Sequence, residues 1–289
     1  MHAELILDCK NEHGEGIFWN PTDGFIWWTD IEGKALHSYD PLTHRTISHS
    51  MPDRVCCFAP RASGGFIIAY ADRVILYNLD TKTETLVTSF EKNNHETRLN
   101  DGRTDRQGRF VVGGMNEVSG KADTSVIRIN TDLSVQTIIE KVSCANSTCF
   151  SPDGTTMFFS DTPTKEIVAF DYNIENGSLS NKRLHASFAN EPGLPDGSCV
   201  DAEGGVWNAE WEGRRVVRMA PNGTIDQVIE VPVWKPTCCA FGGPNLDTLF
   251  ITTSRFMSDE ATIIKEPSSG GIFAVKPGIQ GVIDTPFKG

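Results

Sequence analysis

The stretch Cys149-Phe-Ser-Pro-Asp-Gly-Thr-Thr-Met-Phe-Phe159 joins two short apolar runs through a Pro-Asp-Gly turn, and a third apolar run, Ile167–Asp171, follows it. Short apolar runs bounded by turn residues are typical of β-strands. The same unit occurs earlier as Gly16-Ile-Phe-Trp-Asn-Pro-Thr-Asp-Gly-Phe-Ile-Trp-Trp28 and later as Cys199-Val-Asp-Ala-Glu-Gly-Gly-Val-Trp207. The chain therefore repeats a unit of consecutive antiparallel strands.

The repeat has a nearly constant period. Its turn centres fall near Asp23, Gly64, Asp105, Asp153, Asp201 and Asp247, separated by 41, 41, 48, 48 and 46 residues. Such gaps suit one four-stranded blade of a β-propeller. We therefore predict an all-β fold, a six-bladed β-propeller that forms one domain over residues 1–289.

A spare strand precedes the first unit. Leu5–Leu7 is apolar and lies before the first inner strand, which begins near Gly16. Pairing of this segment with the last blade, beside Gly271–Val275, would remove the open sheet edge. We predict that the N-terminal strand closes the ring in this way.

Composition and charge limit the possible partners. The chain carries a net charge of −12, so a nucleic-acid partner, which needs a basic face, is not expected. We expect no membrane partner either, because no apolar run approaches about 18 residues and an acidic surface repels anionic lipids. The segment Met1–Glu4 lacks a signal-peptide pattern, so we expect a cytoplasmic monomer.

The eight cysteines form no CxxC pair, and we expect buried, reduced thiols.

Oxygen-bearing side chains stand just before several inner strands. Glu15, Asn100 with Asp101, Asn146 and Asp196 each lie five to eight residues before the turn of their blade. Because inner strands start at one mouth of the central channel, these side chains should converge. Crowded acidic and amide oxygens favour a bound divalent cation, with Ca²⁺, Mg²⁺ or Mn²⁺ preferred and Fe²⁺ or Zn²⁺ not excluded. The alternative interpretation is that these Asp and Asn residues only cap turns.

Other catalytic motifs are incomplete or missing. His95-Glu-Thr-Arg-Leu99 begins like HExxH but has leucine at the second zinc-ligand position. The chain contains no GxSxG serine elbow and no P-loop, and its seven histidines form no spaced cluster. We expect Trp27, Trp28 and Trp207 in the blade cores, whereas a ligand-contacting role for Trp211 is left open.

Several motifs together resemble those of a known family. They are His13-Gly-Glu-Gly-Ile-Phe-Trp19, Arg98-Leu-Asn-Asp-Gly102, Gly114-Met-Asn-Glu117, Pro195-Asp-Gly197, Cys239-Ala-Phe-Gly-Gly243 and Gly270-Gly-Ile-Phe273. In this order the chain resembles the gluconolactonase/regucalcin (senescence-marker-protein) family of sugar lactonases. Within that family, the stretches 146–154 and 235–253 are most similar to bacterial pentonolactonases.

The resemblance implies both an activity and a site. Carried over by position, the metal ligands are Glu15, Asn146 and Asp196, and the substrate-binding residues are Arg98, Asn100 and Glu117. Asp196 is the candidate general base, since a carboxylate beside a metal can take a proton from water. The implied reaction is metal-dependent hydrolysis of a small-molecule sugar lactone, a pentonolactone such as xylonolactone or arabinonolactone, to the aldonic acid.

One departure and three alternatives accompany this interpretation. The family often has Asn-Gly where this chain has Asn146-Ser147, which leaves the local backbone conformation in question because glycine eases unusual angles. A gluconolactonase is one alternative. A phosphotriesterase or arylesterase on the same fold would prefer an apolar pocket. A non-catalytic Ca²⁺-binding propeller is the third, because fold alone does not fix function.

Overall fold

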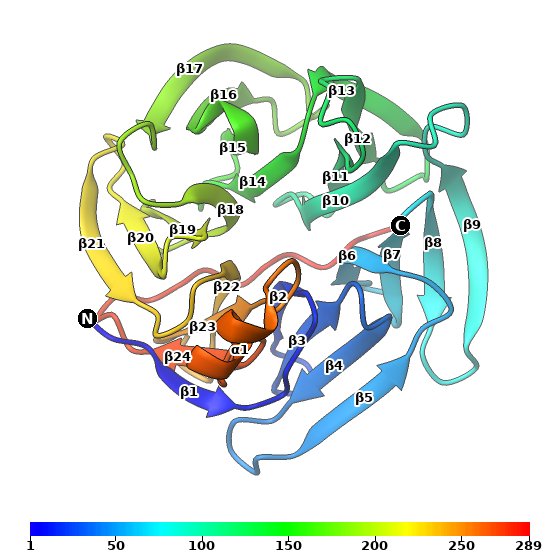
Figure 1. Ribbon diagram of the computed structural model, residues 1–289. Helices are drawn as coiled ribbons and strands as arrows, with labels where there is room; N and C mark the ends of the chain where they lie inside the picture. The colour runs from blue at the N-terminus through cyan, green and yellow to red at the C-terminus, as the bar shows by residue number, and fades with distance from the viewer.

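The computed structural model describes residues 1–289 and contains 24 β-strands in six four-stranded antiparallel sheets. The sheets stand around a common axis as the blades of a propeller (Figure 1), which confirms the predicted fold. Blade 1 contains β2 (Gly14–Asn20), β3 (Phe25–Asp30), β4 (Ala35–Tyr39) and β5 (Thr46–Ser50), and blade 2 contains β6 (Val55–Pro60), β7 (Phe66–Tyr70), β8 (Arg73–Asn78) and β9 (Thr83–Ser89). Blade 3 contains β10 (Thr97–Thr104), β11 (Phe110–Asn116), β12 (Thr124–Ile129) and β13 (Val135–Val142), and blade 4 contains β14 (Ala145–Phe150), β15 (Thr156–Asp161), β16 (Glu166–Tyr172) and β17 (Leu179–Ser187).

The last two blades complete the ring. Blade 5 contains β18 (Leu194–Val200), β19 (Val206–Trp211), β20 (Arg215–Met219) and β21 (Ile225–Glu230), and blade 6 contains β22 (Pro236–Gly242), β23 (Thr248–Thr253), β24 (Ile272–Val275) and β1 (Glu4–Leu7). A 3₁₀ turn, η1 (Thr162–Thr164), follows β15, and a short helix, α1 (Glu260–Lys265), lies between β23 and β24. No helix of the structure has the length and apolar character needed to cross a bilayer.

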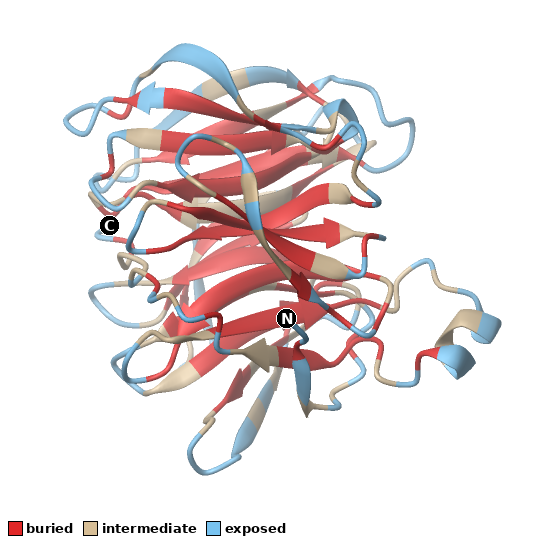
Figure 2. Cartoon of the chain, turned by 90° about the vertical axis from the view of Figure 1, so that its left-hand side faces the viewer, coloured by how far each residue is buried: buried red, intermediate tan, exposed pale blue.

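The hydrophobic core lies between the blades. Each of the six buried apolar clusters draws its residues chiefly from two neighbouring sheets, so every blade packs on two others. Trp27, Trp28 and Trp207 are buried in these layers, as predicted, and Figure 2 shows that burial is concentrated along the middle of the strands. The eight cysteines are all free. Apolar packing of twisted sheets therefore holds the ring around its axis.

The N-terminal strand closes the ring as predicted. β1 is the outermost strand of blade 6 and pairs with β24 in antiparallel register, with Glu4 opposite Ala274 and Leu5 opposite Phe273. The backbone N–H of Ala3 also donates to the carbonyl oxygen of Glu230 in blade 5, at 2.9 Å. The first residues of the chain thus fasten its last two blades together.

Deletion of residues 2–9 should lower the melting temperature by about 5 °C or more, because it exposes the backbone edge of β24 and uncovers the side of blade 6. Differential scanning calorimetry would measure the shift. A matched control is the double variant Glu4→Ala/Leu5→Ala, which keeps the strand backbone while trimming two exposed side chains. This control should melt close to the wild type. An unchanged melting temperature in the deletion variant would contradict closure by β1.

The C-terminal segment after β24 was not anticipated from the sequence. Residues 276–289 run across the end of the propeller axis, as the red chain in Figure 1 shows, and reach the turns of blades 5, 3 and 2. Phe287 is fully buried there, and Asp284 forms an ion pair with Arg103 of β10. The inner-strand turns lie at this end, so the tail covers one mouth of the axis and leaves the other mouth for a site.

All six inner strands are irregular near their first residues. The pairing register shifts within β2, β6, β10, β14, β18 and β22, each time between the inner strand and its neighbour. Such bulges re-aim side chains and are common next to active sites. Here they turn side chains of several blades toward the axis at the mouth that the tail does not cover.

Candidate active site

A cavity of about 310 Å³ lies around the axis at this open mouth. Its floor carries the polar side chains of Glu15, Arg98, Asn100, Asn146 and Asp196. The structure therefore brings together five of the six residues named from the sequence, although they come from four blades. Convergence of the inner strands at one mouth accounts for this.

The local backbone explains how the acidic side chains reach the axis. Glu15 immediately precedes Gly16, whose φ of +56° suits glycine. Asp196 precedes Gly197, where an added Cβ would lie 2.5 Å from Sγ of Cys238 in blade 6. The glycines therefore allow close approach of neighbouring bulges, which in turn places both carboxylates beside the axis.

Glu15 and Asp196 are buried carboxyl groups without an ion-pair partner. Glu15 is 9% exposed and Asp196 6% exposed, and neither takes part in any of the ion pairs of the structure. The Glu15 carboxylate accepts one hydrogen bond, from the N–H of Gly16 at 2.8 Å. Burial, followed by the nearby charge of Asp101, raises the pKa of Glu15 to about 8. Burial, followed by the charge of Glu15, raises the pKa of Asp196 well above its usual range.

Asn146 is held rigidly beside this pair. Its Nδ2 donates to Oγ1 of Thr162 at 2.8 Å, and its Oδ1 accepts from Nδ2 of Asn100 at 3.1 Å. Thr162 in turn donates to the backbone oxygen of Pro195, the residue before Asp196. The amide orientation is therefore fixed from two neighbouring blades.

The donor set fits a hard divalent cation. Two carboxylates would balance the charge of such an ion and the Asn146 amide oxygen adds a neutral donor, which is the chemistry that oxygen-preferring ions select. No group of three His, Cys, Asp or Glu side chains in the structure is placed to hold a metal, so a site here would combine the two carboxylates with an amide oxygen such as that of Asn146. A cation beside the carboxylates would also offset the burial and the negative charges that raise both pKa values.

Arg98 links the floor to Glu117. Its Nε donates to Oε2 of Glu117 at 3.0 Å, and its Nη1 donates to Oδ1 of Asn100 at 2.8 Å. Arg54 binds the same Glu117 carboxylate through both terminal nitrogens, at 2.9 and 2.8 Å. These contacts, with the Arg54 hydrogen bond first, lower the pKa of Glu117. Unlike the other five named residues, Glu117 does not line the cavity, although it is in contact with Arg98, which does.

The apolar part of the cavity wall comes from strand ends and from one loop. Met115, Leu194, Trp211, Phe256 and Met257 contribute to it, the last two from the segment between β23 and β24. Trp211, whose role was left open, therefore borders the cavity.

His13 was not identified from the sequence, where the seven histidines form no spaced cluster. It lines the cavity, with its ring stacked on Phe256 at a centroid distance of 5.2 Å and tilted against Trp211 at 5.7 Å. Burial, followed by the charge of Arg98, lowers its pKa to about 3, so the ring is neutral at ordinary pH. Its position two residues before Glu15, in the same mouth segment, was the signal that could have identified it.

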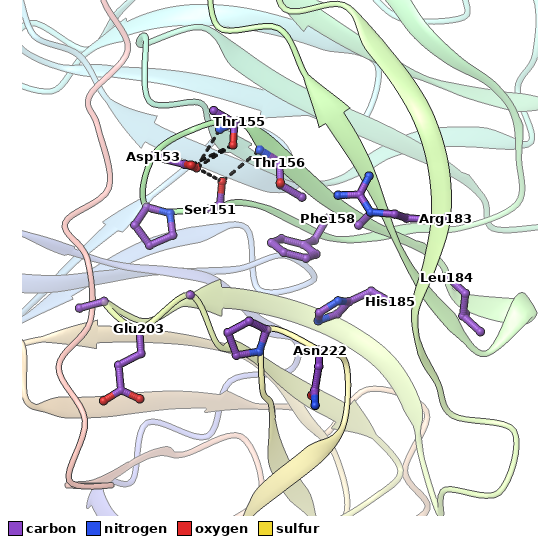
Figure 3. A pocket seen from close by; sticks show the side chains of 15 residues that line it. Ser151, Asp153, Thr155, Thr156, Phe158, Arg183, Leu184, His185, Glu203 and Asn222 are labelled. Carbon is purple, nitrogen blue, oxygen red and sulfur yellow. Dashed lines mark hydrogen bonds between the residues drawn. The ribbon is translucent and has the colours of Figure 1, made fainter.

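A larger depression, of about 510 Å³, lies between blades 4 and 5 (Figure 3) but shows no comparable chemistry. Its Asp153 carboxylate accepts hydrogen bonds from Ser151 and Thr155 within one turn. That turn is at the far end of β14 from Asn146. The central cavity is therefore the candidate active site.

Comparison with known proteins agrees with this geometry. Residues 13–255 match the model of the SMP-30/gluconolactonase/LRE-like region. The chain belongs to this family. An L-arabinolactonase from Azospirillum brasilense is 34% identical over 99% of this chain and 96% of its own length, and a 6-deoxy-6-sulfogluconolactonase from Pseudomonas putida is 30% identical over 96% and 95%. The crystal structure of regucalcin from Agrobacterium tumefaciens, described as a calcium-binding protein, superposes with a TM-score of 0.94 at 28% identity, covering 99% and 97% of the two chains.

Membership of the SMP-30/gluconolactonase family confirms the resemblance drawn from the motifs. It also confirms, at the level of reaction class, that the chain is a lactonase, that is, a hydrolase of sugar lactones. The individual roles of Glu15, Arg98, Asn100, Glu117, Asn146 and Asp196 stay predictions. The question about the Asn146-Ser147 backbone is answered, because Ser147 takes the left-handed conformation with φ of +58°.

Proposed function

We propose that this SMP-30/gluconolactonase family member is a metal-dependent lactonase that opens neutral pentonolactones, such as arabinonolactone or xylonolactone, to aldonic acids. The observation that carries the proposal is the pair of buried carboxyl groups, Glu15 and Asp196, which lines the cavity without an ion-pair partner and whose pKa values are both raised. Keeping such a pair in a folded protein is costly unless a cation or a proton compensates it.

The protein groups divide the work of lactone hydrolysis. Glu15, Asn146 and Asp196 would hold one divalent ion. When bound, that ion supplies a Lewis acid for the lactone carbonyl. Asp196 takes a proton from the attacking water, whose oxygen forms the new bond to the carbonyl carbon. The ring C–O bond then breaks, and the former ring oxygen takes the proton that Asp196 accepted, which gives the hydroxyl group of the aldonic acid.

Arg98 and Asn100 are placed for substrate contact and orientation. Arg98 Nη2 has no hydrogen-bond partner within the protein, so it can donate to a substrate oxygen or to developing oxyanion charge. Asn100 uses both hydrogens of its amide on the backbone oxygen of Ala145 and on Asn146. It therefore acts chiefly by orienting Asn146, while Glu117 holds Arg98 in place.

The lysine and arginine side chains in and near the cavity favour a substrate without an anionic group. Arg98 and Arg54 both bind the Glu117 carboxylate. Nζ of Lys235 donates to the backbone oxygen of Phe256 at 2.8 Å and lies over the Trp211 and Trp234 rings. Arg98 is the one lysine or arginine that lines the cavity, and its charge is paired with Glu117, so no unpaired cation faces a sulfonate or phosphate there. The activity named for the arabinolactonase relative therefore suits this cavity better than that named for the sulfogluconolactonase.

A lactone panel tests this assignment. Acid release would be measured in a pH-stat with L-arabinono-, D-xylono-, D-glucono- and 6-deoxy-6-sulfogluconolactone, using protein stripped by chelator and then restored with single divalent ions. We expect kcat/KM for a neutral pentonolactone to exceed that for the sulfonated lactone by about tenfold or more, because the sulfonate would lose water without gaining a partner. Equal rates would contradict the substrate class.

The same assay separates the alternatives. Full activity after verified metal removal would contradict the metal mechanism. Turnover of an aryl ester or phosphotriester with no lactone turnover would favour the esterase alternative. Metal binding without turnover of any substrate would favour a non-catalytic Ca²⁺-binding propeller.

A further inference from the structure

Ser147 adopts a backbone conformation that serine ordinarily avoids. It directly follows Asn146 within the bulge of β14, is completely buried, and has a φ of +58°. Glycine would adopt this conformation without steric cost, whereas any Cβ is strained there. Retention of strain next to a functional side chain points to a compensating role for the serine hydroxyl.

The hydroxyl joins two blades. Oγ of Ser147 donates to the backbone oxygen of Asp196 at 2.7 Å, across the gap between β14 and β18. It also accepts hydrogen bonds from Nδ2 of Asn208 at 2.9 Å and from Oγ of Ser198 at 3.1 Å. All these side chains are buried. One hydroxyl therefore connects the residue after Asn146 with the main chain of Asp196 itself.

We propose that Ser147 is a positioning residue, whose hydroxyl fixes the separation of Asn146 and Asp196 and so sets the affinity of the site for its divalent ion. The inference rests on the proposed function, because it assigns the two neighbouring residues to one ion. Hydrogen-bond partners that orient metal ligands commonly change metal affinity by about 10- to 100-fold when removed. Glycine at this position would suit the backbone but could not make the link.

The rest of the bulge would survive loss of this hydroxyl. The N–H of Thr148 donates to Oδ2 of Asp101 at 2.8 Å, and Asn146 keeps its bonds to Asn100 and Thr162. The Asp196 carbonyl oxygen keeps the hydrogen bond from Asn208 at 2.8 Å. Removal of the hydroxyl therefore leaves no buried carbonyl without a partner, and the variants should fold.

Two substitutions separate positioning from general stability. Ser147→Gly removes both the hydroxyl and the strain, and Ser147→Ala removes the hydroxyl but keeps the strained Cβ. The melting temperature of chelator-stripped protein should therefore be higher in the glycine variant than in the alanine variant. Isothermal titration of each stripped protein with Ca²⁺, and with Mn²⁺, should nevertheless show about tenfold weaker binding in both variants than in the wild type. Their kcat at saturating metal should also fall.

Ser198→Ala is the matched control. It removes a buried serine hydroxyl from the same cluster but leaves the bond from Ser147 to Asp196 intact, so its metal affinity should stay near that of the wild type. Wild-type metal affinity in Ser147→Gly would overturn the proposal, and so would an affinity loss confined to the less stable alanine variant. Failure of the proposed function is recognised separately, since the wild type itself would then bind no divalent ion or open no lactone.

Discussion

Asp196→Asn should lower kcat for a pentonolactone by about a thousandfold, even at saturating divalent ion, because the change removes both a charged ligand and the proposed base. General-base catalysis alone contributes roughly 10²- to 10⁴-fold. Asparagine is nearly isosteric with aspartate, so the buried site keeps its shape. Metal affinity should fall as well, since one negative charge no longer faces the cation.

Steady-state rates at increasing metal concentration would separate the two losses. If Asp196 only bound the ion, saturating metal would restore kcat; if it is also the base, kcat stays low. Asp153→Asn is the matched control, because Asp153 lies in an exposed turn at the opposite face and an amide oxygen can still accept the turn hydrogen bonds. Wild-type kcat in Asp196→Asn at saturating metal would rule out the base assignment.

The parts of the fold set by local periodicity could be predicted. Turn residues such as Asp153 and Asp201 mark where each inner strand ends, and six such turns fix the number of blades. The position of Leu5–Leu7 before the first unit was enough to predict ring closure. The last blade would otherwise keep an unpaired outer edge, and this spare strand can pair with it. The central site followed from the same geometry.

Features that depend on long-range loop contacts could not be predicted. Glu117 does not line the cavity, and its carboxylate is bound by Arg54 of another blade. The apolar wall depends on Phe256 and Met257, which the β23–β24 segment brings over the mouth. Strand spacing gives no information on such contacts.

Removal of the metal should make the protein less stable as pH rises. A carboxylate paired with a cation has the opposite effect, because it stabilises the fold more at higher pH. In the metal-free protein, burial and the charge of Asp101 raise the pKa of Glu15 to about 8, and burial and the charge of Glu15 raise the pKa of Asp196 well above its usual range. A carboxyl whose folded pKa is raised stabilises the fold while it is protonated. This contribution is complete below the unfolded pKa near 4.5 and is lost as pH rises toward about 8. The melting temperature of stripped protein should therefore fall between pH 5 and pH 8.5, by about 5 °C or more.

Glu15→Gln isolates this effect from every other titration of the chain. Glutamine is uncharged throughout, so the stripped variant should lack this part of the decline and should melt above the stripped wild type at pH 8.5, with the two converging near pH 5. A saturating divalent ion should reverse the order at pH 8.5, because the wild type then gains binding free energy that the variant has largely lost. Calorimetry of the four samples at the two pH values gives the comparison. Parallel curves for stripped wild type and Glu15→Gln would contradict the uncompensated carboxylate pair on which the metal site depends.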